Sequence, residues 1–217
     1  MKKVIILGAS GASLDILSII EDINEFNEEK IEFIGFLEDN LKKVDKKNRK
    51  FILGDFKKRF SNPDIKYVTA FGNEDNYFIR DKIIKKLNIP LKQFTNIIHP
   101  NSLINKSSKI GKGVVVHAFS TISRNTKIGN HCVLLPKSTV SHDTSVGSYT
   151  IISTNVIISG YSKIGKLCYL GAGCSLRDRI NVGDRTLVGM GAVITKNAQK
   201  NSVYVGNPGK LLRKVRI

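Results

Sequence analysis

The second half of the chain carries an aliphatic residue at every sixth position without interruption. In the frame that starts at Ile104, each of sixteen successive sixes begins with Ile, Leu or Val, and the frame ends at Gln199. An amphipathic helix would place apolar residues three and four apart, and a single strand would place them two apart. The period of six therefore predicts a parallel β-helix, and a second period of eighteen indicates three short strands in each coil of a triangular prism.

Each position of the six has an expected role. The aliphatic first residue points into the prism and stacks on its equivalent one coil away, so each coil depends on its neighbours for burial. The fifth residue is mostly small and lets the chain turn the corner. An aliphatic–glycine pair recurs every eighteen residues, from Ile110-Gly111 to Val182-Gly183, and these glycines are expected where a corner needs a positive φ.

The first hundred residues alternate between strand and helix patterns. The apolar runs 4–7, 31–37 and 67–71 predict strands, and the spacing in 14–23 and up to about residue 87 predicts helices. The lysine-rich segment 41–50 is expected to be an exposed loop. The predicted fold class is thus an α/β Rossmann-like domain over residues 1–98, followed by a parallel β-helix domain with a C-terminal tail over residues 99–217.

A ligand crevice is expected where the strands of the first domain end. In open α/β sheets ligands bind outside the carboxyl ends of the strands, with a phosphate near the first helix N-terminus. The turn lacks the full three-glycine dinucleotide pattern, so NAD is disfavoured, and a purely structural turn is the alternative. The residues that this reasoning places around the crevice are Gly8, Ser10, Gly11, Glu38, Asp39, Gly72 and Asn73.

Composition narrows the class of protein. The 217 residues are 41% hydrophobic, and no run approaches the ~18 apolar residues that span a membrane. The apolar start is too short for a signal peptide, which predicts a cytoplasmic protein without membrane insertion. The formal net charge of +17 raises the possibility of nucleic-acid binding, but the lysines are dispersed and few aromatic residues accompany them. A solvated lysine-rich surface, or attraction of phosphate-bearing small molecules, explains the charge better.

The three cysteines give no sign of a disulfide framework or a metal site. Cys132, Cys168 and Cys174 all occupy the small fifth position of the repeat, where a thiol serves as a compact spacer. None has metal-ligand spacing with a histidine, so no metal is expected.

Several segments together resemble one family. They are VIILGASG at the start, IEFIGFLEDN, ILGDF, IIHPNSLI, the tripeptide SHD inside the prism, and VGNPGKLLRKV near the end. The chain resembles the bacterial nucleotide-sugar acetyltransferases, which have a left-handed β-helix and usually work as trimers. Known members N-acetylate UDP-4-amino sugars, and close relatives O-acetylate sialic acids. The resemblance implies a homotrimeric, acetyl-CoA-dependent N-acetyltransferase that acts on a UDP- or dTDP-linked amino sugar by direct transfer. A sugar O-acetyltransferase and an inactive nucleotide-sugar-binding scaffold are the alternatives.

The family's catalytic base is a histidine followed by an acid, and His142 and Asp143 stand at that place. Imidazole can accept a proton near neutral pH, and a neighbouring carboxylate can fix its tautomer and support the cation. Counting by eighteen places His142 between Arg124 and Gly160, and Gly160 is expected to leave open space beside the imidazole. A solvated corner residue is the alternative for His142. Structural or surface roles are expected for the other three histidines, His99, His117 and His131.

The resemblance also implies a groove for acetyl-CoA between two neighbouring prisms. Small residues along the coils would contact pantetheine, and two basic residues of the tail could meet the adenosine 3′-phosphate; the candidates are Gly160, Gly171, Ala172, Gly173, Gly189, Gly191, Lys210 and Arg213. Three positions depart from the family pattern. Ala12 and Ser13 end a turn in which the family usually has a histidine, and Ile151 replaces a histidine that often follows the base by nine positions.

Overall fold

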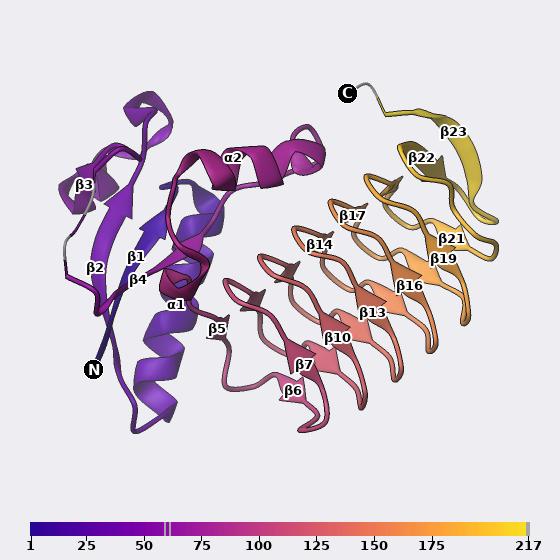
Figure 1. The fold of residues 1–217 in the computed structure, drawn as a ribbon, viewed down its shortest axis with the longest axis horizontal. Coiled ribbons are helices and arrows are strands. Elements are labelled where there is room, and N and C mark those ends of the chain that lie inside the picture. Colours follow the sequence, from indigo (N-terminus) through magenta and orange to yellow (C-terminus); the bar gives the residue numbers. More distant parts are fainter. Residues whose placement is uncertain (59, 61, 216–217) are drawn as a thin grey trace.

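The computed structural model describes residues 1–58, 60 and 62–215, and it has the two predicted parts (Figure 1). The first part is a parallel four-stranded sheet in the order β3-β2-β1-β4 with helices beside it. Its strands are β1 (Lys2–Leu7), β2 (Ile31–Leu37), β3 (Ile52–Gly54) and β4 (Ile65–Thr69). Strand β4 begins two residues before the predicted 67–71, because Ile65 and Lys66 still pair with β1. The short strand β3 was not predicted.

Helices connect these strands and cover them. They are α1 (Gly11–Phe26), η1 (Leu41–Lys43), η2 (Lys46–Phe51), η3 (Tyr77–Ile79), α2 (Arg80–Lys86) and η4 (Leu91–Gln93). The segment 41–50 is exposed at most of its described positions, as predicted, but it is not an irregular loop. Two 3₁₀ turns form there, because the Asn40 and Asp45 side chains each accept a backbone N–H at the start of a turn and Val44 is buried.

The second part is a prism of three parallel sheets. The docking sheet contains β5 (Ile97–Ile98), β8 (Val115–Val116), β11 (Val133–Leu134), β14 (Ile151–Ile152), β17 (Tyr169–Leu170), β20 (Leu187–Val188), β22 (Ser202–Val205) and β23 (Lys210–Lys214). The open sheet contains β6 (Leu103–Ile104), β9 (Thr121–Ile122), β12 (Thr139–Val140), β15 (Ile157–Ile158), β18 (Ser175–Leu176) and β21 (Val193–Ile194). The lysine sheet contains β7 (Lys109–Ile110), β10 (Lys127–Ile128), β13 (Ser145–Val146), β16 (Lys163–Ile164) and β19 (Asn181–Val182).

The predicted frame is the register of the prism. From β5 to β21 each coil pairs with the next at a separation of eighteen residues, so that Ile128 lies between Ile110 and Val146 in the lysine sheet. From Val116 onward, the first residue of each six is at most 4% exposed, and these side chains form one continuous core. Strand β5 already pairs with β8, so the first coil starts at Ile97. The division of the chain at residue 98 stays a prediction.

Glycine is needed at the recurring positions for a different reason from the one expected. None of the five has a positive φ; instead, a Cβ on Gly129 would lie 2.5 Å from the backbone nitrogen of Ser148 in the next coil. The other four meet the next coil in the same way, so these glycines permit close contact between coils. The left-handed conformation falls on the fourth residue of the six, which includes Asp143 at φ 57° and Tyr161 at φ 58°.

The small fifth residues turn inward and bond to the next coil. The Thr126 hydroxyl donates to the Ser141 carbonyl at 3.2 Å, and the Thr150 hydroxyl donates to the Gly165 carbonyl at 2.9 Å. The three cysteines occupy equivalent buried places, and burial raises the pKa of the Cys132 thiol to about 11. These positions close the corners of the core, as the spacer interpretation requires.

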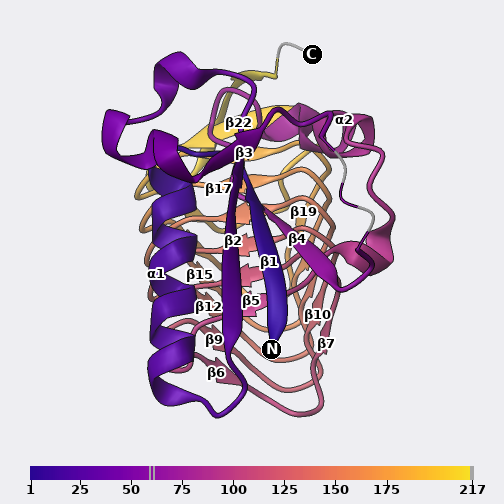
Figure 2. The same cartoon turned by 90° about the vertical axis from the view of Figure 1, so that its left-hand side faces the viewer.

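The α/β domain packs on the first coils through apolar and polar contacts. Helix α1 shares one buried cluster with β1, with Ile97 and with Val115, and it runs along one side of the sheet in front of the prism (Figure 2). Arg80, at the start of α2, is fully buried between the two parts. Its guanidinium donates to the carbonyls of Phe71, His131 and Tyr149 at 3.0, 3.1 and 2.7 Å. One cation therefore fastens the end of β4 to two successive coils.

Candidate active site

His142 and Asp143 lie at the corner where the chain passes from β12 in the open sheet to β13 in the lysine sheet. The Asp143 Oδ2 atom is 2.9 Å from His142 Nδ1, and the two side chains are 26% and 43% exposed. The left-handed backbone at Asp143 turns its carboxylate back toward the preceding residue. With Nδ1 directed at the carboxylate, Nε2 is the nitrogen that is free to accept a proton.

The carboxylate is held in its ionised form. Hydrogen bonds from His142 and then from Asn125, with the positive charge of Arg124 adding to them, lower the pKa of Asp143 below its ordinary value. An ionised carboxylate beside the ring stabilises the imidazolium that forms when His142 takes up a proton. The pair therefore has the chemistry of a general base with its orienting acid.

His142 faces a groove of about 510 Å³ at the first coils. The lining residues come from the open sheet and the corner that follows it: Leu103, Ile104, Asn105, Thr121, Ile122, Ser123, Arg124 and His142. None of the described residues of the α/β domain lines this groove. The base therefore faces outward from the prism, on a face that another molecule can approach.

Gly160 does not leave open space beside the imidazole. A Cβ at this position would lie 2.8 Å from His142 Cε1 and 3.0 Å from Nε2, so the ring itself already occupies that space. The expectation of a gap for substrate at Gly160 was wrong, because the small residue allows the imidazole to fold down on the next coil.

Two residues that the sequence reading passed over complete this corner. Tyr161 meets the His142 ring edge to face, with centroids 5.1 Å apart, and the Arg179 guanidinium lies 4.5 Å from the centre of the Tyr161 ring. Both occupy the left-handed fourth position, one and two coils beyond Asp143. Counting by eighteen from Asp143 could have found them.

The α/β domain has its own crevice of about 470 Å³ at the carboxyl ends of its strands. Five predicted residues line it: Gly8, Ser10, Glu38, Gly72 and Asn73. They are joined by Ala12, Asn40, Phe56, Ala70, Phe71, Asn76 and Ile83. Glu38 accepts backbone N–H groups from Ala9 at 3.1 Å and Asn40 at 2.9 Å, which holds the first turn against the end of β2.

Gly11 and Asp39 do not line this crevice. Asp39 accepts the Phe56 N–H at 2.8 Å, so its carboxylate serves the chain between β2 and β4. Gly11 is the first residue of α1. The expectation that these two residues surround the crevice was wrong. The Asp39 carboxylate is hydrogen-bonded to the Phe56 backbone, and Gly11 is part of helix α1.

The departures from the family pattern also acquire a structural meaning. Ser13 is fully buried and its hydroxyl accepts the Ser10 N–H at 3.1 Å, so it closes the start of α1. Ile151 is 4% exposed and reaches within 2.9 Å of where a Cβ on Gly72 would lie. Ser13 therefore stabilises the first turn of the crevice, Ile151 packs the prism against Gly72, and neither side chain is titratable.

Apart from Gly160, which lies against the His142 ring, the candidate acetyl-CoA residues are remote from His142 within one chain. Gly171 to Gly173 and Gly189 to Gly191 follow β17 and β20, at the corner between the docking sheet and the open sheet. Gly173 and Gly191 have φ of 68° and 65° with open space around them, whereas Gly171 lies against the Met190 nitrogen. Lys210 and Arg213 are exposed on β23, and Arg213 lines a cavity of about 410 Å³ with the segment that follows β4.

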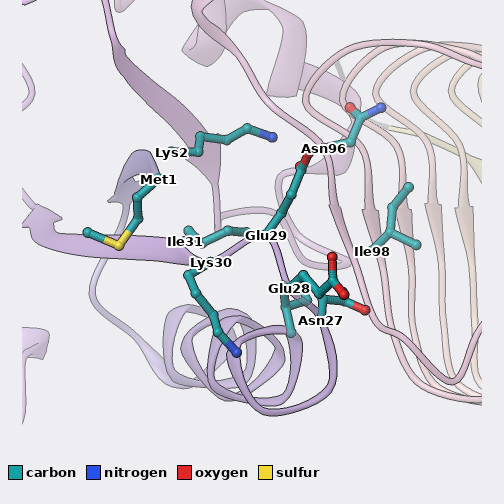
Figure 3. A pocket seen from close by; sticks show the side chains of 10 residues that line it. Met1, Lys2, Asn27, Glu28, Glu29, Lys30, Ile31, Asn96 and Ile98 are labelled. Atoms are coloured by element: carbon teal, nitrogen blue, oxygen red, sulfur yellow. The ribbon is translucent and has the colours of Figure 1, made fainter.

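Another cavity, of about 670 Å³, lies at the opposite edge of the α/β sheet. Met1, Lys2, Asn27 to Ile31, Asn96 and Ile98 surround it, at the amino ends of the parallel strands (Figure 3). Ligands of open α/β sheets bind at the carboxyl ends, so the smaller crevice is the better candidate for a nucleotide. In the part of the chain that the structure describes, no helix is long and apolar enough to cross a membrane, and no cluster of three or more metal-binding side chains occurs.

Comparison with known proteins agrees with this architecture. Residues 3–87 match the family model of the PglD N-terminal domain, and residues 98–207 match that of the GMPPB C-terminal domain. No curated protein sequence matches the chain significantly.

Solved structures match over the whole chain. The acetyltransferase domain of PglB from Neisseria gonorrhoeae FA1090 is 25% identical with a TM-score of 0.83, covering 98% of this chain and 100% of that chain. The same domain has been solved in complex with acetyl coenzyme A. A mutant of perosamine N-acetyltransferase from Caulobacter crescentus, in complex with CoA and GDP-perosamine, is 19% identical with a TM-score of 0.77, covering 98% and 97%. WeeI from Acinetobacter baumannii AYE is 22% identical with a TM-score of 0.73, covering 98% and 100%.

These likenesses confirm the fold class, an α/β Rossmann-like domain followed by a left-handed parallel β-helix. An α/β domain with a crevice at its strand ends, followed by such a prism, is the architecture of the sugar acetyltransferases that the chain matches. The chain belongs to the bacterial nucleotide-sugar acetyltransferases of the left-handed β-helix type.

Proposed function

We propose that this protein transfers the acetyl group of acetyl-CoA to the amine of a nucleotide-linked amino sugar, with His142 as general base. The observation that carries the proposal is the pair of His142 and Asp143, 2.9 Å apart, facing the groove on the open sheet. The crevice of the α/β domain supplies a separate place for the nucleotide, as its position at the strand ends favours.

The transfer needs no covalent enzyme intermediate. The amine nitrogen attacks the thioester carbonyl carbon, a new C–N bond forms, and the C–S bond breaks to release CoA thiolate. His142 Nε2 takes the proton that the amine loses, and the ionised Asp143 stabilises the resulting imidazolium. The proton then passes from the imidazolium to the thiolate or to solvent, which restores the base.

Activity requires a second copy of the chain in this proposal. The candidate acetyl-CoA glycines from Gly171 to Gly191 lie on a different corner of the prism from His142, and the face between the two corners is the open sheet. Within its two-residue strands the outward positions carry no charge, and Leu103 and Ile157 among them are 70% and 45% exposed. A neighbouring prism packed on this face would bury the apolar side chains and close the groove, and a homotrimer is the assembly that we propose. Light scattering that gave a fully active monomer would contradict it. The cytoplasmic location stays a prediction.

The test is turnover with UDP-, dTDP- and GDP-linked amino sugars, with free sialic acid as the O-acetylation arm. His142→Ala should lower kcat by ~10²- to 10⁴-fold, the usual contribution of a general base, with little change in acetyl-CoA affinity. Asp143→Asn should lose less, because the base remains. Nucleotide-sugar binding without turnover on any substrate would identify a scaffold instead. Wild-type kcat in His142→Ala, with an unchanged melting temperature, would place the base elsewhere.

A further inference from the structure

The corner that carries the base continues one coil below it, at Asn125. Asn125 lies eighteen residues before Asp143 and shares its left-handed backbone, with φ of 56°. Its amide Nδ2 donates to Asp143 Oδ1 at 3.1 Å, while the other carboxylate oxygen, Oδ2, faces His142. The two oxygens of one carboxylate are thus divided between an amide below and an imidazole beside it.

Asn125 is itself held from the coil beneath. Its backbone N–H donates to the Ser107 hydroxyl at 2.9 Å, and the Ser107 hydroxyl also lies 2.9 Å from Asn105 Oδ1. The first coil of the prism therefore holds the backbone of Asn125, and the side-chain amide of the same residue bonds to Asp143. A line of polar contacts runs from Ser107 through Asn125 and Asp143 to the base.

The left-handed backbone does not by itself require asparagine here. Asparagine tolerates a positive φ better than most residues, which gives Asn125 a possible role as a turn former. However, the same conformation is taken by Tyr161 and Arg179 in the same column and by Phe119, Lys137 and Leu167 at other corners. The prism therefore accepts other side chains at this position, and the contact with Asp143 gives asparagine a particular use.

We propose that Asn125 is a positioning residue of the active site, which fixes the Asp143 carboxylate so that its second oxygen stays on His142 Nδ1. A neutral amide suits this task, because it donates a hydrogen bond and leaves the negative charge of the carboxylate available to the imidazolium. Without it, the partly exposed carboxylate can rotate toward water, and the ring loses its fixed tautomer and direction. The inference rests on the proposed function of His142 as the base.

The experiment is a double-mutant cycle on kcat with a matched control. Asn125→Ala should lower kcat about tenfold, corresponding to about 1.4 kcal/mol, with little change in either KM. The same change in an Asp143→Ala background should have no further effect. Asn155→Ala is the control, because Asn155 has φ of 57° and an exposed side chain at a different corner. It carries the same backbone cost and should leave kcat near the wild-type value.

A second variant and a second readout keep the test decisive. Asn125→Asp retains tolerance of the left-handed backbone but sets one carboxylate against another, so it should lower kcat at least as far as alanine. ¹⁵N NMR of the histidine rings, of which the chain has 4, reports the tautomer of His142 without any substrate. We expect one dominant Nδ1–H tautomer in the wild type and a mixture in both Asn125 variants.

Equal losses of kcat in Asn125→Ala and Asn155→Ala would show a backbone effect and overturn the proposal. A loss that persists undiminished in the Asp143→Ala background would overturn it too. Failure of the proposed function would give a different result, because His142→Ala would then keep the wild-type kcat. The NMR comparison would still report whether Asn125 fixes the contact between Asp143 and His142.

Discussion

Replacing Gly160 with alanine should move the base without unfolding the prism. Gly160 has no positive φ, so alanine fits its backbone, and the atoms that a Cβ would meet belong to the side chain of His142. The nearest, Cε1, would lie 2.8 Å away, whereas ordinary contact begins at 3.4 Å. The ring must therefore shift by 3.4 − 2.8 = 0.6 Å or more, or swing outward, which its exposed side permits.

The expected effect falls on catalysis. A displacement approaching 1 Å at a reacting group can cost ~10²-fold in rate, so Gly160→Ala should lower kcat by ~10- to 100-fold. The free energy of unfolding should change by less than about 1 kcal/mol, because a stiffer backbone offsets part of the crowding. The assay is kcat and both KM values, with urea unfolding alongside. In a His142→Ala background the added methyl group should cost no further activity or stability.

An unchanged kcat in Gly160→Ala would refute this reasoning, since it would mean that the position of the ring does not limit transfer. A raised KM for acetyl-CoA with normal kcat would refute it differently. That result would assign Gly160 to the pantetheine groove alone, as the family resemblance implies.

Two further predictions concern stability. Gly129→Ala places a Cβ 2.5 Å from the Ser148 backbone and should lower the free energy of unfolding by ~3 kcal/mol or more, because it forces the coils apart. Gly173→Ala, at φ 68° in open space, should lower it by only ~1 kcal/mol. Urea unfolding midpoints compare the two variants, and the reverse order would show that backbone φ governs the cost. Burial and then the charge of Arg80 lower the pKa of His131 from 6.5 to about 4, so the unfolded chain binds the proton first as pH falls. Stability should therefore drop between pH 6.5 and 4, by up to about 3 kcal/mol from this residue, and His131→Asn should flatten that slope; an unchanged slope would mean that other groups set it.

The sequence alone determined the prism and the place of the proposed base. Three sixes make one coil of eighteen residues, so an uninterrupted period of six stacks Ile128, Val146 and Ile164 in register on neighbouring coils. The same count placed His142 at a corner, and the alternating pattern of the first hundred residues predicted three of the four strands of the α/β sheet, all but β3. The local sequence pattern was enough to predict the structure wherever buried residues recur at a fixed interval.

Only the tertiary structure decided what happens between coils and between domains. Three features depend on the spacing and side-chain directions of neighbouring coils. They are the close approach of Gly129 to the next backbone, the packing of the His142 ring on Gly160, and the hydrogen bond from Asn125 to Asp143. The burial of Arg80 depends on how α2 meets carbonyls distant in sequence. The sequence period predicts which residues are neighbours on adjacent coils. The hydrogen bonds and contacts of their side chains depend on how the coils pack in three dimensions.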